Sequence, residues 1–309
     1  MSNSNEHFQF TDERFADLQM LRYRLNGFED LTLSQQIYIY CLAKATLMGR
    51  DITFDQQGKY NLRIRKTLET VYLHYEGDRE CEEFKAFEVY LKRIWFASGI
   101  HHHYGCEKFK PGFSEEYFYH LLENIGEELL PIKRGETKED LMRQLESILF
   151  DPVVMPKRVN QTDGEDLVQT SACNFYEDVT QEEVERFYAK MKNTDNPNPP
   201  SYGLNSKLTK RNNEVVELTW KEDGLYGETI REIVSWLLKA QKYAENEGQK
   251  HVIDLLVKFY RTGSLEDFDR YSIAWVEQHE GLVDFINGFI EVYGDPLGMK
   301  GTWEGIVEY

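Results

Sequence analysis

The sequence predicts an α+β fold in which a shell of helices surrounds a small sheet. Helical spacing of apolar residues recurs along most of the 309 residues, whereas only a few short segments alternate as strands do. Helices and strands do not alternate regularly, which argues against a Rossmann fold or a TIM barrel. Apolar residues make up 41% of the chain and aromatic residues 14%, which is enough for a packed core and excludes an intrinsically disordered chain.

Residues 1–192 are predicted to form a mainly helical part. The segment 21–25 alternates apolar residues with arginine and predicts a half-buried strand ahead of the first helix. That helix is expected over Leu33–Met48, with Thr32 as its N-cap and Gly49 where a C′ glycine belongs. Its buried stripe is predicted to comprise Ile37, Tyr40, Cys41, Ala45 and Met48. Similar patterns predict further helices at about 60–76, 80–98, 114–130 and 137–150.

A loop is predicted at residues 193–201, because a stretch so rich in proline and asparagine cannot continue a helix. The remaining part, residues 202–309, is expected to begin with a hairpin. Its strands are 202–210 and 215–220, and its turn is Asn212-Asn213, since asparagine tolerates positive φ. Helices are then predicted at about 225–246, 249–261 and 264–279.

The charge balance limits the classes of partner. Lysine and arginine total 36 and aspartate and glutamate 54, so the net charge is −18. This argues against a nucleic-acid or anionic-membrane partner and suits cationic ligands, including the free ammonium end of a peptide. No run of apolar residues is long enough to span a bilayer. Residues 1–7 have neither the basic nor the apolar region of a signal peptide, so a cytoplasmic location is expected unless a leader has been removed.

Common catalytic motifs are absent. The sequence has no GxxxxGK[ST], GxGxxG, GxSxG or HExxH motif and no kinase signature. Its four cysteines include no CxxC pair, so reduced and mostly buried thiols are expected. The adjacent imidazoles of His101–His103 cannot all point at one metal from a regular helix or strand. A polar cluster facing a loop is the favoured interpretation there, with a metal site as the alternative.

A second candidate site lies near the end of the chain. Residues 282–293 fit a strand or the end of a helix, and Asp295 with the proline after it forces a turn. If 290–293 is extended, Glu291 and Tyr293 share one face at about 6.6–7 Å, and two residues of extended peptide span a similar distance. A carboxylate and a phenol so placed can hold a peptide's ammonium and reach the carbonyl two residues in. The alternative is a pair of side chains that merely face solvent.

Three motifs stand out when the sequence is compared with known families. The longest is Phe289–Gly298, which reads Phe-Ile-Glu-Val-Tyr-Gly-Asp-Pro-Leu-Gly and continues through Trp303-Glu304-Gly305. The second comprises Gly99, Tyr104, Gly105, Lys108, Phe109 and Pro111, and the third is Tyr202–Leu208. Together they resemble the dipeptidyl peptidase III family, zinc exopeptidases that remove dipeptides from the amino termini of short peptides, and the third motif looks like the bacterial type of that family.

The resemblance implies that the chain is the amino-terminal, substrate-binding half of such an enzyme. The family holds zinc through His-Glu-x-x-Gly-His and Glu-Glu-x-Arg-Ala-Asp motifs, and neither occurs in these 309 residues. The resemblance therefore implies that the zinc lobe is missing, that this chain binds no zinc, and that it is inactive alone. The implied fold is the family's lower lobe, whose small β-barrel also takes strands from later sequence.

The resemblance also assigns roles to residues. Glu291 resembles the carboxylate that binds the substrate's α-ammonium, and Tyr293 the phenol that donates a hydrogen bond to the oxyanion. Ile290 and Val292 flank them as substrate-binding positions, although Val292 replaces the serine of some relatives. Tyr104 stands where the family has an aromatic residue lining the pocket for the substrate's first side chain. The histidines before Tyr104 receive no role.

Two other functions remain as alternatives. The chain could be a peptide-binding module that captures peptides without cutting them, which the acidic balance permits. It could also be a helical interaction scaffold, which its aromatic-rich helices and its proline-rich loop fit equally well. The first alternative predicts affinity for free amino termini, and the second predicts a defined protein partner.

Overall fold

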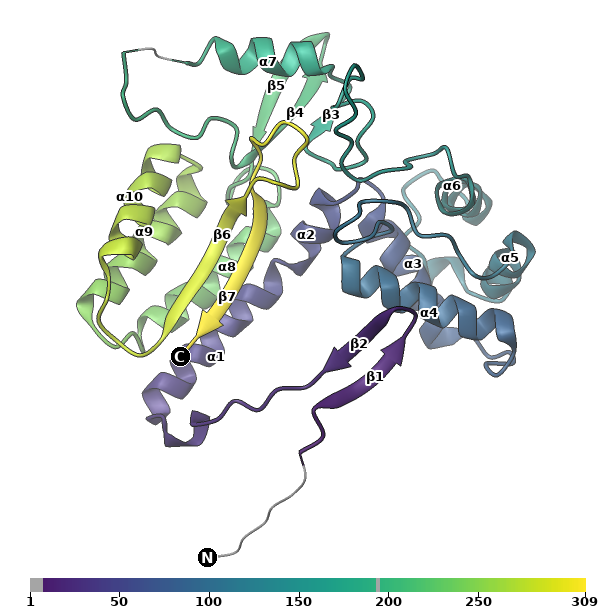
Figure 1. Cartoon of the computed structure of the whole chain (residues 1–309), viewed down its shortest axis with the longest axis horizontal. Coiled ribbons are helices and arrows are strands. Elements are labelled where there is room, and N and C mark those ends of the chain that lie inside the picture. The colour runs from purple at the N-terminus through teal and green to yellow at the C-terminus, as the bar shows by residue number, and fades with distance from the viewer. Residues whose placement is uncertain (1–7, 193–194) are drawn as a thin grey trace, which may run out of the picture.

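The computed structural model describes residues 8–192 and 195–309, which form helices and short strands (Figure 1). The helices are α1 (Leu33–Met48), α2 (Arg50–Gln56), α3 (Asn61–His74), α4 (Glu82–Ala97), α5 (Glu115–Glu123), α6 (Lys138–Phe150), α7 (Gln181–Ala189), α8 (Gly227–Gln241), α9 (Glu247–Thr262) and α10 (Leu265–Glu277). The strands are β1 (Thr11–Phe15), β2 (Leu18–Leu21), β3 (Tyr176–Glu177), β4 (Ser206–Arg211), β5 (Glu214–Thr219), β6 (Asp284–Glu291) and β7 (Thr302–Glu308). The chain is therefore mixed helix and sheet, as predicted. None of the described helices is long and apolar enough to cross a membrane.

The strands do not form one barrel-like sheet. Within the described residues they make three separate sheets, β1-β2, β3-β4-β5 and β6-β7. A barrel needs every strand to have a neighbour on both sides, but β6 and β7 pair only with each other here. The barrel-like sheet that the resemblance implies is therefore not confirmed by the described residues.

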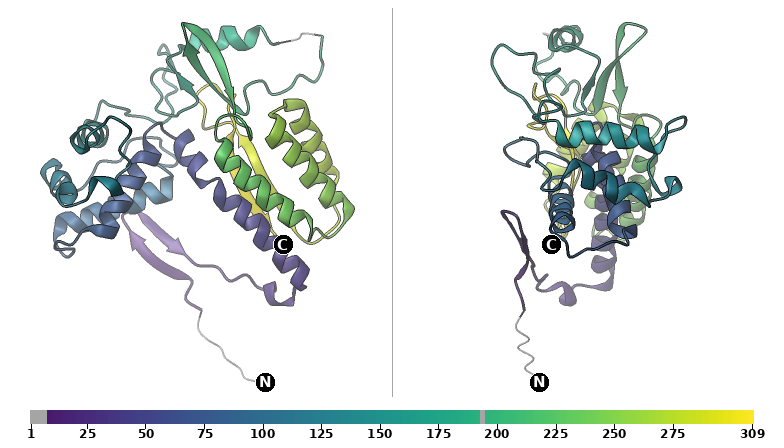
Figure 2. Two further views of the ribbon diagram at one scale, coloured as in Figure 1. Left: turned by 180° about the vertical axis from the view of Figure 1, so that it is seen from behind. Right: turned by 90° about the vertical axis from the view of Figure 1, so that its right-hand side faces the viewer.

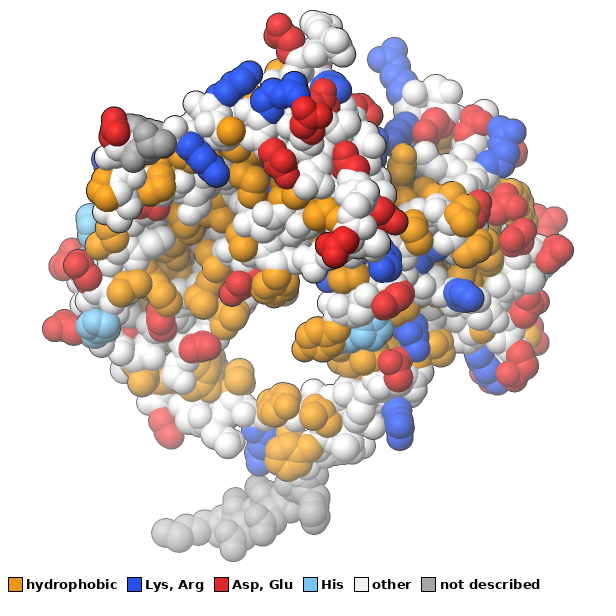
Figure 3. Space-filling view, turned by 45° about the horizontal axis from the view of Figure 1, so that its top comes forward, with side chains coloured by type: hydrophobic (Ala, Val, Ile, Leu, Met, Phe, Trp, Pro, Cys, Tyr) orange, Lys and Arg blue, Asp and Glu red, His pale blue; other side chains and the backbone are white. Residues whose placement is uncertain are grey.

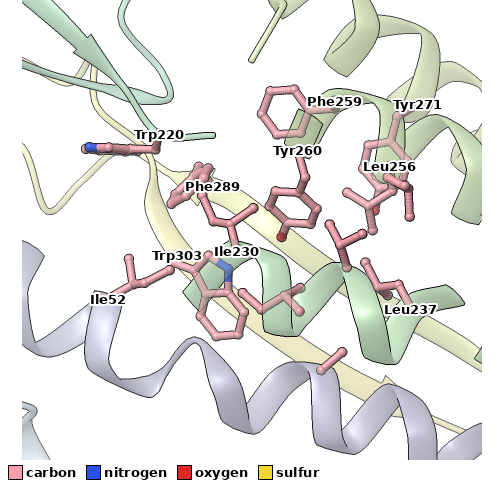
Figure 4. Close-up of a cluster of buried hydrophobic side chains, with 14 of the residues drawn as sticks. Ile52, Trp220, Ile230, Leu237, Leu256, Phe259, Tyr260, Tyr271, Phe289 and Trp303 are labelled. Atoms are coloured by element: carbon pink, nitrogen blue, oxygen red, sulfur yellow. The ribbon is translucent and has the colours of Figure 1, made fainter. Parts of the chain in front are cut away.

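Two hydrophobic clusters make up the core. The smaller one lies among α3, α4, α5 and α6. The larger one joins α1 with α8, α9, α10 and β6-β7, so it unites residues from both sides of the predicted loop. Figure 2 shows these two groups of helices on opposite sides of the molecule. In the close-up of the larger cluster, Phe289 lies between Trp220 and Trp303 (Figure 4), and its ring centroid is 4.7 Å from that of Trp220.

The predicted first helix forms, but its C-terminal cap and its set of buried residues each differ from the prediction in one respect. The Thr32 side chain accepts a hydrogen bond from the Gln35 amide in a capping box. Gly49 follows the last residue but has φ −74°, because the chain turns directly into α2 instead of using a left-handed cap. Tyr40 is 56% exposed, so its assignment to the buried stripe is wrong, and Tyr38 is buried instead.

Other predicted elements agree with the structure to different degrees. The hairpin β4-β5 forms with Asn212 and Asn213 at φ 50° and 66°, as expected. The helix predicted at 114–130 ends at Glu123, and a separate 3₁₀ turn follows at Glu127–Leu129. Of the predicted loop 193–201, residues 193–194 lie outside the described residues, as does the segment 1–7 in which a leader was sought.

The strand predicted at 21–25 is wrong beyond its first residue. Strand β2 ends at Leu21, and Tyr23 and Leu25 are 77% and 64% exposed. The segment between β2 and α1 arches away from the body, and Figure 3 shows an opening bordered by hydrophobic side chains at that place. The alternation there fails as a burial signal because no described element packs against either face.

The four cysteines are unpaired, as expected. Cys41 and Cys173 are buried, and Cys81 and Cys106 are half-buried. Burial raises the pKa of the Cys173 thiol far above its ordinary value, so this side chain stays protonated in the core.

Strand β7 is anchored to the junction of α1 and α2. The buried Gln56 side chain accepts a hydrogen bond from the Trp303 amide at 2.8 Å and donates one to the Gly301 carbonyl at 3.0 Å. The Trp303 indole lies against Gly49, where an added Cβ would be 2.3 Å from ring carbons. Glycine at position 49 is therefore required by close packing.

A charged cluster joins the turn between α2 and α3 to β3 and β4. Glu177 forms ion pairs with Lys59 and, at 2.9 Å, with Lys207. Hydrogen bonding from Lys59, with a further contribution from Lys207, lowers the pKa of Glu177 to about 2. Lys207 also donates to the buried Asn174 side chain at 2.6 Å. The cluster therefore ties the three-stranded sheet to the helices that precede it.

We expect Gly49→Ala to lower the free energy of unfolding by about 1–3 kcal/mol, because the new methyl group must displace a rigid indole ring. Urea unfolding followed by tryptophan fluorescence measures the change. The matched control is Gly112→Ala, where an added Cβ meets only the Ala86 methyl group at 3.3 Å. Equal losses in the two variants would contradict the assigned role of the Trp303 contact.

We expect Glu177→Gln to destabilise the fold by about 1 kcal/mol at neutral pH, after allowance for solvent screening. The pKa of Glu177 is lower in the folded state, so its contribution is present above about 4.5 and is lost as pH falls toward about 2. The difference between parent and variant should therefore shrink over that window in urea titrations. Glu182→Gln, at an exposed i,i+4 pair with Arg186, should show no such convergence. A pH-independent difference for Glu177→Gln would refute this assignment.

Candidate functional site

The site is built on the end of β6 and the loop that follows it. Alternate residues of β6, namely Phe285, Asn287 and Phe289, are buried against the helices. Tyr260 from α9 donates a hydrogen bond to the Asn287 side chain at 2.5 Å, which fixes the strand at its middle. Glu291 is the last residue of β6 and pairs in register with Thr302 of β7.

The extended geometry considered for 290–293 holds only as far as the end of β6. The strand stops at Glu291, and the pairing register shifts between Phe289 and Glu291. Tyr293 lies in a turn, in which the Asp295 amide donates a hydrogen bond to the Val292 carbonyl at 3.1 Å. The regular spacing of two residues on one strand face therefore does not apply to Glu291 and Tyr293.

Asp295 organises the loop from the inside. Its buried carboxylate accepts hydrogen bonds from the Tyr176 hydroxyl at 2.8 Å and from the amides of Met299 and Lys300 at 2.8 and 2.9 Å. Burial raises the pKa of Asp295, and these hydrogen bonds partly offset that rise. The Asp295-Pro296 turn predicted from sequence is thus held by side-chain hydrogen bonds to the loop's own backbone.

Lys300 attaches the far end of the loop to the rest of the fold. Its side chain is fully buried, and its ammonium donates to the hydroxyls of Tyr188 and Ser206. Burial lowers the pKa of Lys300 to about 7, and the charge of Glu217 opposes this shift. The loop is therefore fixed at both ends, and Tyr293 stands on a well-supported backbone.

The predicted polar pair faces outward. Tyr293 is 72% exposed, and Glu291 is exposed at the end of the strand. Desolvation raises the pKa of Tyr293, and the charges of Glu304 and Glu291 raise it further. The pKa of Glu304 is raised by burial and by the charge of Glu291. Two carboxylates and a phenol therefore lie close enough to affect one another's ionisation.

Tyr104 lies at the same site, on the turn after α4. It is 86% exposed, and its ring centroid is 4.5 Å from that of His103. The phenol of Tyr104 contributes to raising the pKa of Tyr293, so the structure brings together two residues that are distant in sequence. Ile290 and Val292 are half-buried beside Glu291, and neither side chain lines the pocket described next.

The three adjacent histidines have different surroundings. His101 is buried with its Nε2 2.9 Å from the Met155 carbonyl, and burial lowers its pKa to about 4, so the ring is neutral. His102 accepts hydrogen bonds at Nδ1 from the amides of Tyr104 and Gly105 at 3.2 and 3.0 Å. No group of three potential metal ligands occurs among residues 8–192 and 195–309. The described residues therefore offer no cluster of side chains that fits a zinc ion.

A pocket of about 240 Å³ opens beside Tyr293. Its walls come from α2, the end of α4, strand β7 and the turn that contains His103, here called the histidine turn. They include His103, Arg158, Tyr293 and Glu304, with Phe96 as an aromatic wall. The pocket therefore places charged groups next to the phenol.

Glu304 and Arg158, two charged residues of this pocket, were not among the predicted site residues. Glu304 falls within the continuation of the long motif, so its position in sequence was a usable signal. Arg158 lies in an irregular segment between α6 and β3, and nothing in the sequence around it marks it as part of a site. Only the packing of that segment against the histidine turn brings Arg158 to the pocket.

We expect Glu304→Gln to lower the pKa of Tyr293, because removing a nearby negative charge makes the phenolate less costly. Titration of the phenolate's ultraviolet absorbance, taken as the difference from Tyr293→Phe, measures the shift. Glu308→Gln, an exposed position at the other end of β7, is the control and should leave this pKa unchanged. An unchanged pKa in Glu304→Gln would contradict the proposed proximity.

Comparisons with known proteins identify relatives of this chain. Residues 171–309 match peptidase family M49. Dipeptidyl peptidase 3 from Mus musculus is 27% identical over 252 residues, which is 73% of this chain and 33% of the mouse protein. The protein of that name from Homo sapiens is 25% identical over 313 residues, covering 91% of this chain and 42% of the human protein.

The fold agrees with a solved structure of the same name. Dipeptidyl peptidase III from Caldithrix abyssi matches 92% of this chain and 40% of its own length, with a TM-score of 0.58 and 17% sequence identity. The chain thus spans about a third to two fifths of the proteins that it matches. In sequence this chain is therefore similar to dipeptidyl peptidases III, as its motifs indicated, and its fold agrees with theirs.

Proposed function

We propose that this chain provides the substrate-binding wall of a dipeptidyl peptidase that removes dipeptides from the amino termini of short peptides. The observation that carries the proposal is the grouping of Glu291, Glu304 and Tyr293 at an exposed strand end beside a pocket. The relationship to peptidase family M49 supports a hydrolase, and the motif around Glu291 and Tyr293 supports their assignment to the substrate.

The two carboxylates suit the amino terminus of a peptide. The Glu291 side chain has no hydrogen bond or ion pair with any other described residue, so its carboxylate is available to a ligand. Burial raises the pKa of Glu304 and the negative charge of Glu291 raises it further, and an ammonium group between the two carboxylates would relieve their repulsion. We therefore assign Glu291 to binding the α-ammonium, with Glu304 as a second carboxylate close by.

Tyr293 suits a role in stabilising negative charge. Its pKa is raised, so the phenol keeps its proton at neutral pH and can donate a hydrogen bond to an oxygen on which charge develops. The rigid loop under Tyr293 holds this donor in place before the substrate arrives. Tyr104, beside it, is proposed to line the pocket for the substrate's first side chain, with Ile290 and Val292 flanking the bound peptide.

The open edges of β6-β7 offer a way to hold the peptide backbone. Among the described residues these strands pair only with each other, so no third strand covers either outer edge, although Gln56 and Thr53 already bond the Trp303 amide and carbonyl of β7. An extended peptide can add to such an edge through main-chain hydrogen bonds, which give affinity without sequence selectivity. We propose this mode of binding, and that later strands of a longer chain complete the barrel of the family's lower lobe.

Zinc is proposed to belong to the catalytic lobe that would accompany this wall. In the dipeptidyl peptidase III family the metal supplies an activated water as the nucleophile. The described residues of this chain offer no group of three ligands for it, so we expect these 309 residues to bind peptides without cleaving them. A cytoplasmic location stays a prediction.

We expect Glu291→Gln to weaken the binding of a short peptide with a free amino terminus about tenfold, because a charge-assisted contact with the ammonium is lost. Isothermal titration calorimetry of the 309-residue chain measures the affinity. An amino-terminally acetylated peptide is the ligand control and should bind weakly to parent and variant alike. Glu308→Gln is the matched charge control on β7.

Tyr293→Phe separates binding from chemistry. The variant should bind the same peptide with nearly the parent's affinity, because its hydroxyl is proposed to act on charge that develops only during reaction. In a longer chain that includes the zinc lobe, the substitution should lower kcat about 10²- to 10³-fold with little change in KM. Tight binding of the acetylated peptide, or an unchanged kcat in Tyr293→Phe, would refute the proposed roles.

A further inference from the structure

Arg158 is held rigidly next to the pocket. Its amide donates a hydrogen bond to the Cys106 carbonyl at 2.9 Å, and its carbonyl accepts one from the Cys173 amide at 3.0 Å. Its guanidinium Nη2 donates to the His103 carbonyl at 3.1 Å and lies 3.5 Å from the Cys106 sulfur. Contacts on both the backbone and the side chain therefore fix the direction of the guanidinium.

This guanidinium has no carboxylate partner. No ion pair within 4.0 Å joins Arg158 to any residue in the described ranges, and its Nε is buried without a hydrogen-bond partner. The other buried arginines differ, because Arg63 is paired with Glu136 and Arg65 with Asp51. A half-buried charge that lacks a counter-ion carries a desolvation cost that an anionic ligand would relieve.

Tyr293 has both negatively and positively charged neighbours. The charges of Glu304 and Glu291 raise the pKa of Tyr293, and the charge of Arg158 lowers it. Arg158, Tyr293 and Glu304 all line the same pocket. A ligand that carries an ammonium and a carboxylate a few ångströms apart is therefore complementary to this site, whereas a purely cationic ligand leaves Arg158 unpaired.

We infer that Arg158 binds a carboxylate of the ligand and makes the site selective for peptides that carry one close to a free amino terminus. This inference rests on the proposed function, because Glu291 and Glu304 supply the ammonium contact. The planar fork of a guanidinium can bind both oxygens of a carboxylate, which gives geometric selectivity as well as affinity.

Two sources can supply this carboxylate. One is an aspartate or glutamate side chain at the first or second residue of the peptide. The other is the α-carboxylate of a free dipeptide, which lies within two residues of the ammonium, about 6.6–7 Å in extended chain. The pocket, at about 240 Å³, is smaller than the roughly 300–1,000 Å³ usual for whole small-molecule ligands, so it suits one side chain or one chain end.

The test compares matched peptides by calorimetry on the 309-residue chain at neutral pH. Glu-Ala-Ala-amide is compared with Gln-Ala-Ala-amide, and Ala-Glu-Ala-amide with Ala-Gln-Ala-amide, which tests the side-chain source. Ala-Ala is compared with Ala-Ala-amide, which tests the free dipeptide. We expect at least one carboxylate ligand to bind about tenfold tighter than its amide.

Two variants of Arg158 and one control variant test whether Arg158 causes this gain in affinity. Arg158→Met should abolish it, and Arg158→Lys should retain only part of it, because lysine keeps the charge but loses the fork. Arg143→Met removes an exposed arginine on α6 and should leave the gain unchanged. The comparison of ligands on the parent chain needs no variant, so it stays decisive even if Arg158→Met fails to fold.

The outcomes separate this inference from the proposed function. If free-amino peptides bind but no carboxylate ligand binds tighter than its amide, this inference is overturned and the proposed function stands. If the gain persists in Arg158→Met, the carboxylate is bound elsewhere and the inference is again overturned. If no free-amino peptide binds at all, both fail together.

Discussion

The contact between strand β7 and the junction of α1 and α2 is the constraint on which the rest of the structure depends. Trp303 packs against Gly49 without room for a side chain, and the buried Gln56 amide bonds the Trp303 amide in β7 and the carbonyl of Gly301, the residue before β7. The Thr53 hydroxyl adds a hydrogen bond to the Trp303 carbonyl. The two sides of this contact are about 250 residues apart in sequence. The contact therefore sets where β6, its neighbour, can end and where Glu291 and Tyr293 stand.

The site combines a rigid base with exposed functional groups. Asp295 and Lys300 hold the loop by buried hydrogen bonds, so the backbone under Tyr293 gains support from the interior. The side chains of Glu291, Tyr293 and Tyr104 face outward and are free to meet a ligand. This division suits catalysis and binding alike, because a donor that is already oriented costs little reorganisation when the ligand arrives.

Electrostatics give the site its polarity. The chain is strongly acidic overall, and two carboxylates at the strand end extend that character into the site. Arg158 adds a single positive charge on another wall of the pocket, without a counter-ion among the described residues. In the proposed function, peptides with a free amino terminus meet the acidic wall first, and the guanidinium then discriminates among them by the groups that follow the ammonium.

Elements whose own residues carry strong turn or capping signals could be predicted from the amino-acid sequence. The Thr32 cap, the Asn212-Asn213 turn and the Asp295-Pro296 turn depend on residues that bond or bend their own backbone, so nothing distant is needed to form them. The long motif also placed Glu291, Tyr293 and Glu304 in one segment. Local alternation failed at 21–25, because whether a face is buried depends on what packs against it.

The assembly of the site depends on long-range contacts that could not be predicted from the sequence. These contacts end β6 at Glu291 and place Tyr104 near Tyr293. They also place Arg158 in the pocket wall without a carboxylate partner among the described residues. None of these follows from spacing along the chain, because each depends on loops that are positioned by their contacts with helices and strands far away in sequence. The sequence thus supplied the polar residues of the site and the turns around them, and long-range packing decided which of those residues meet.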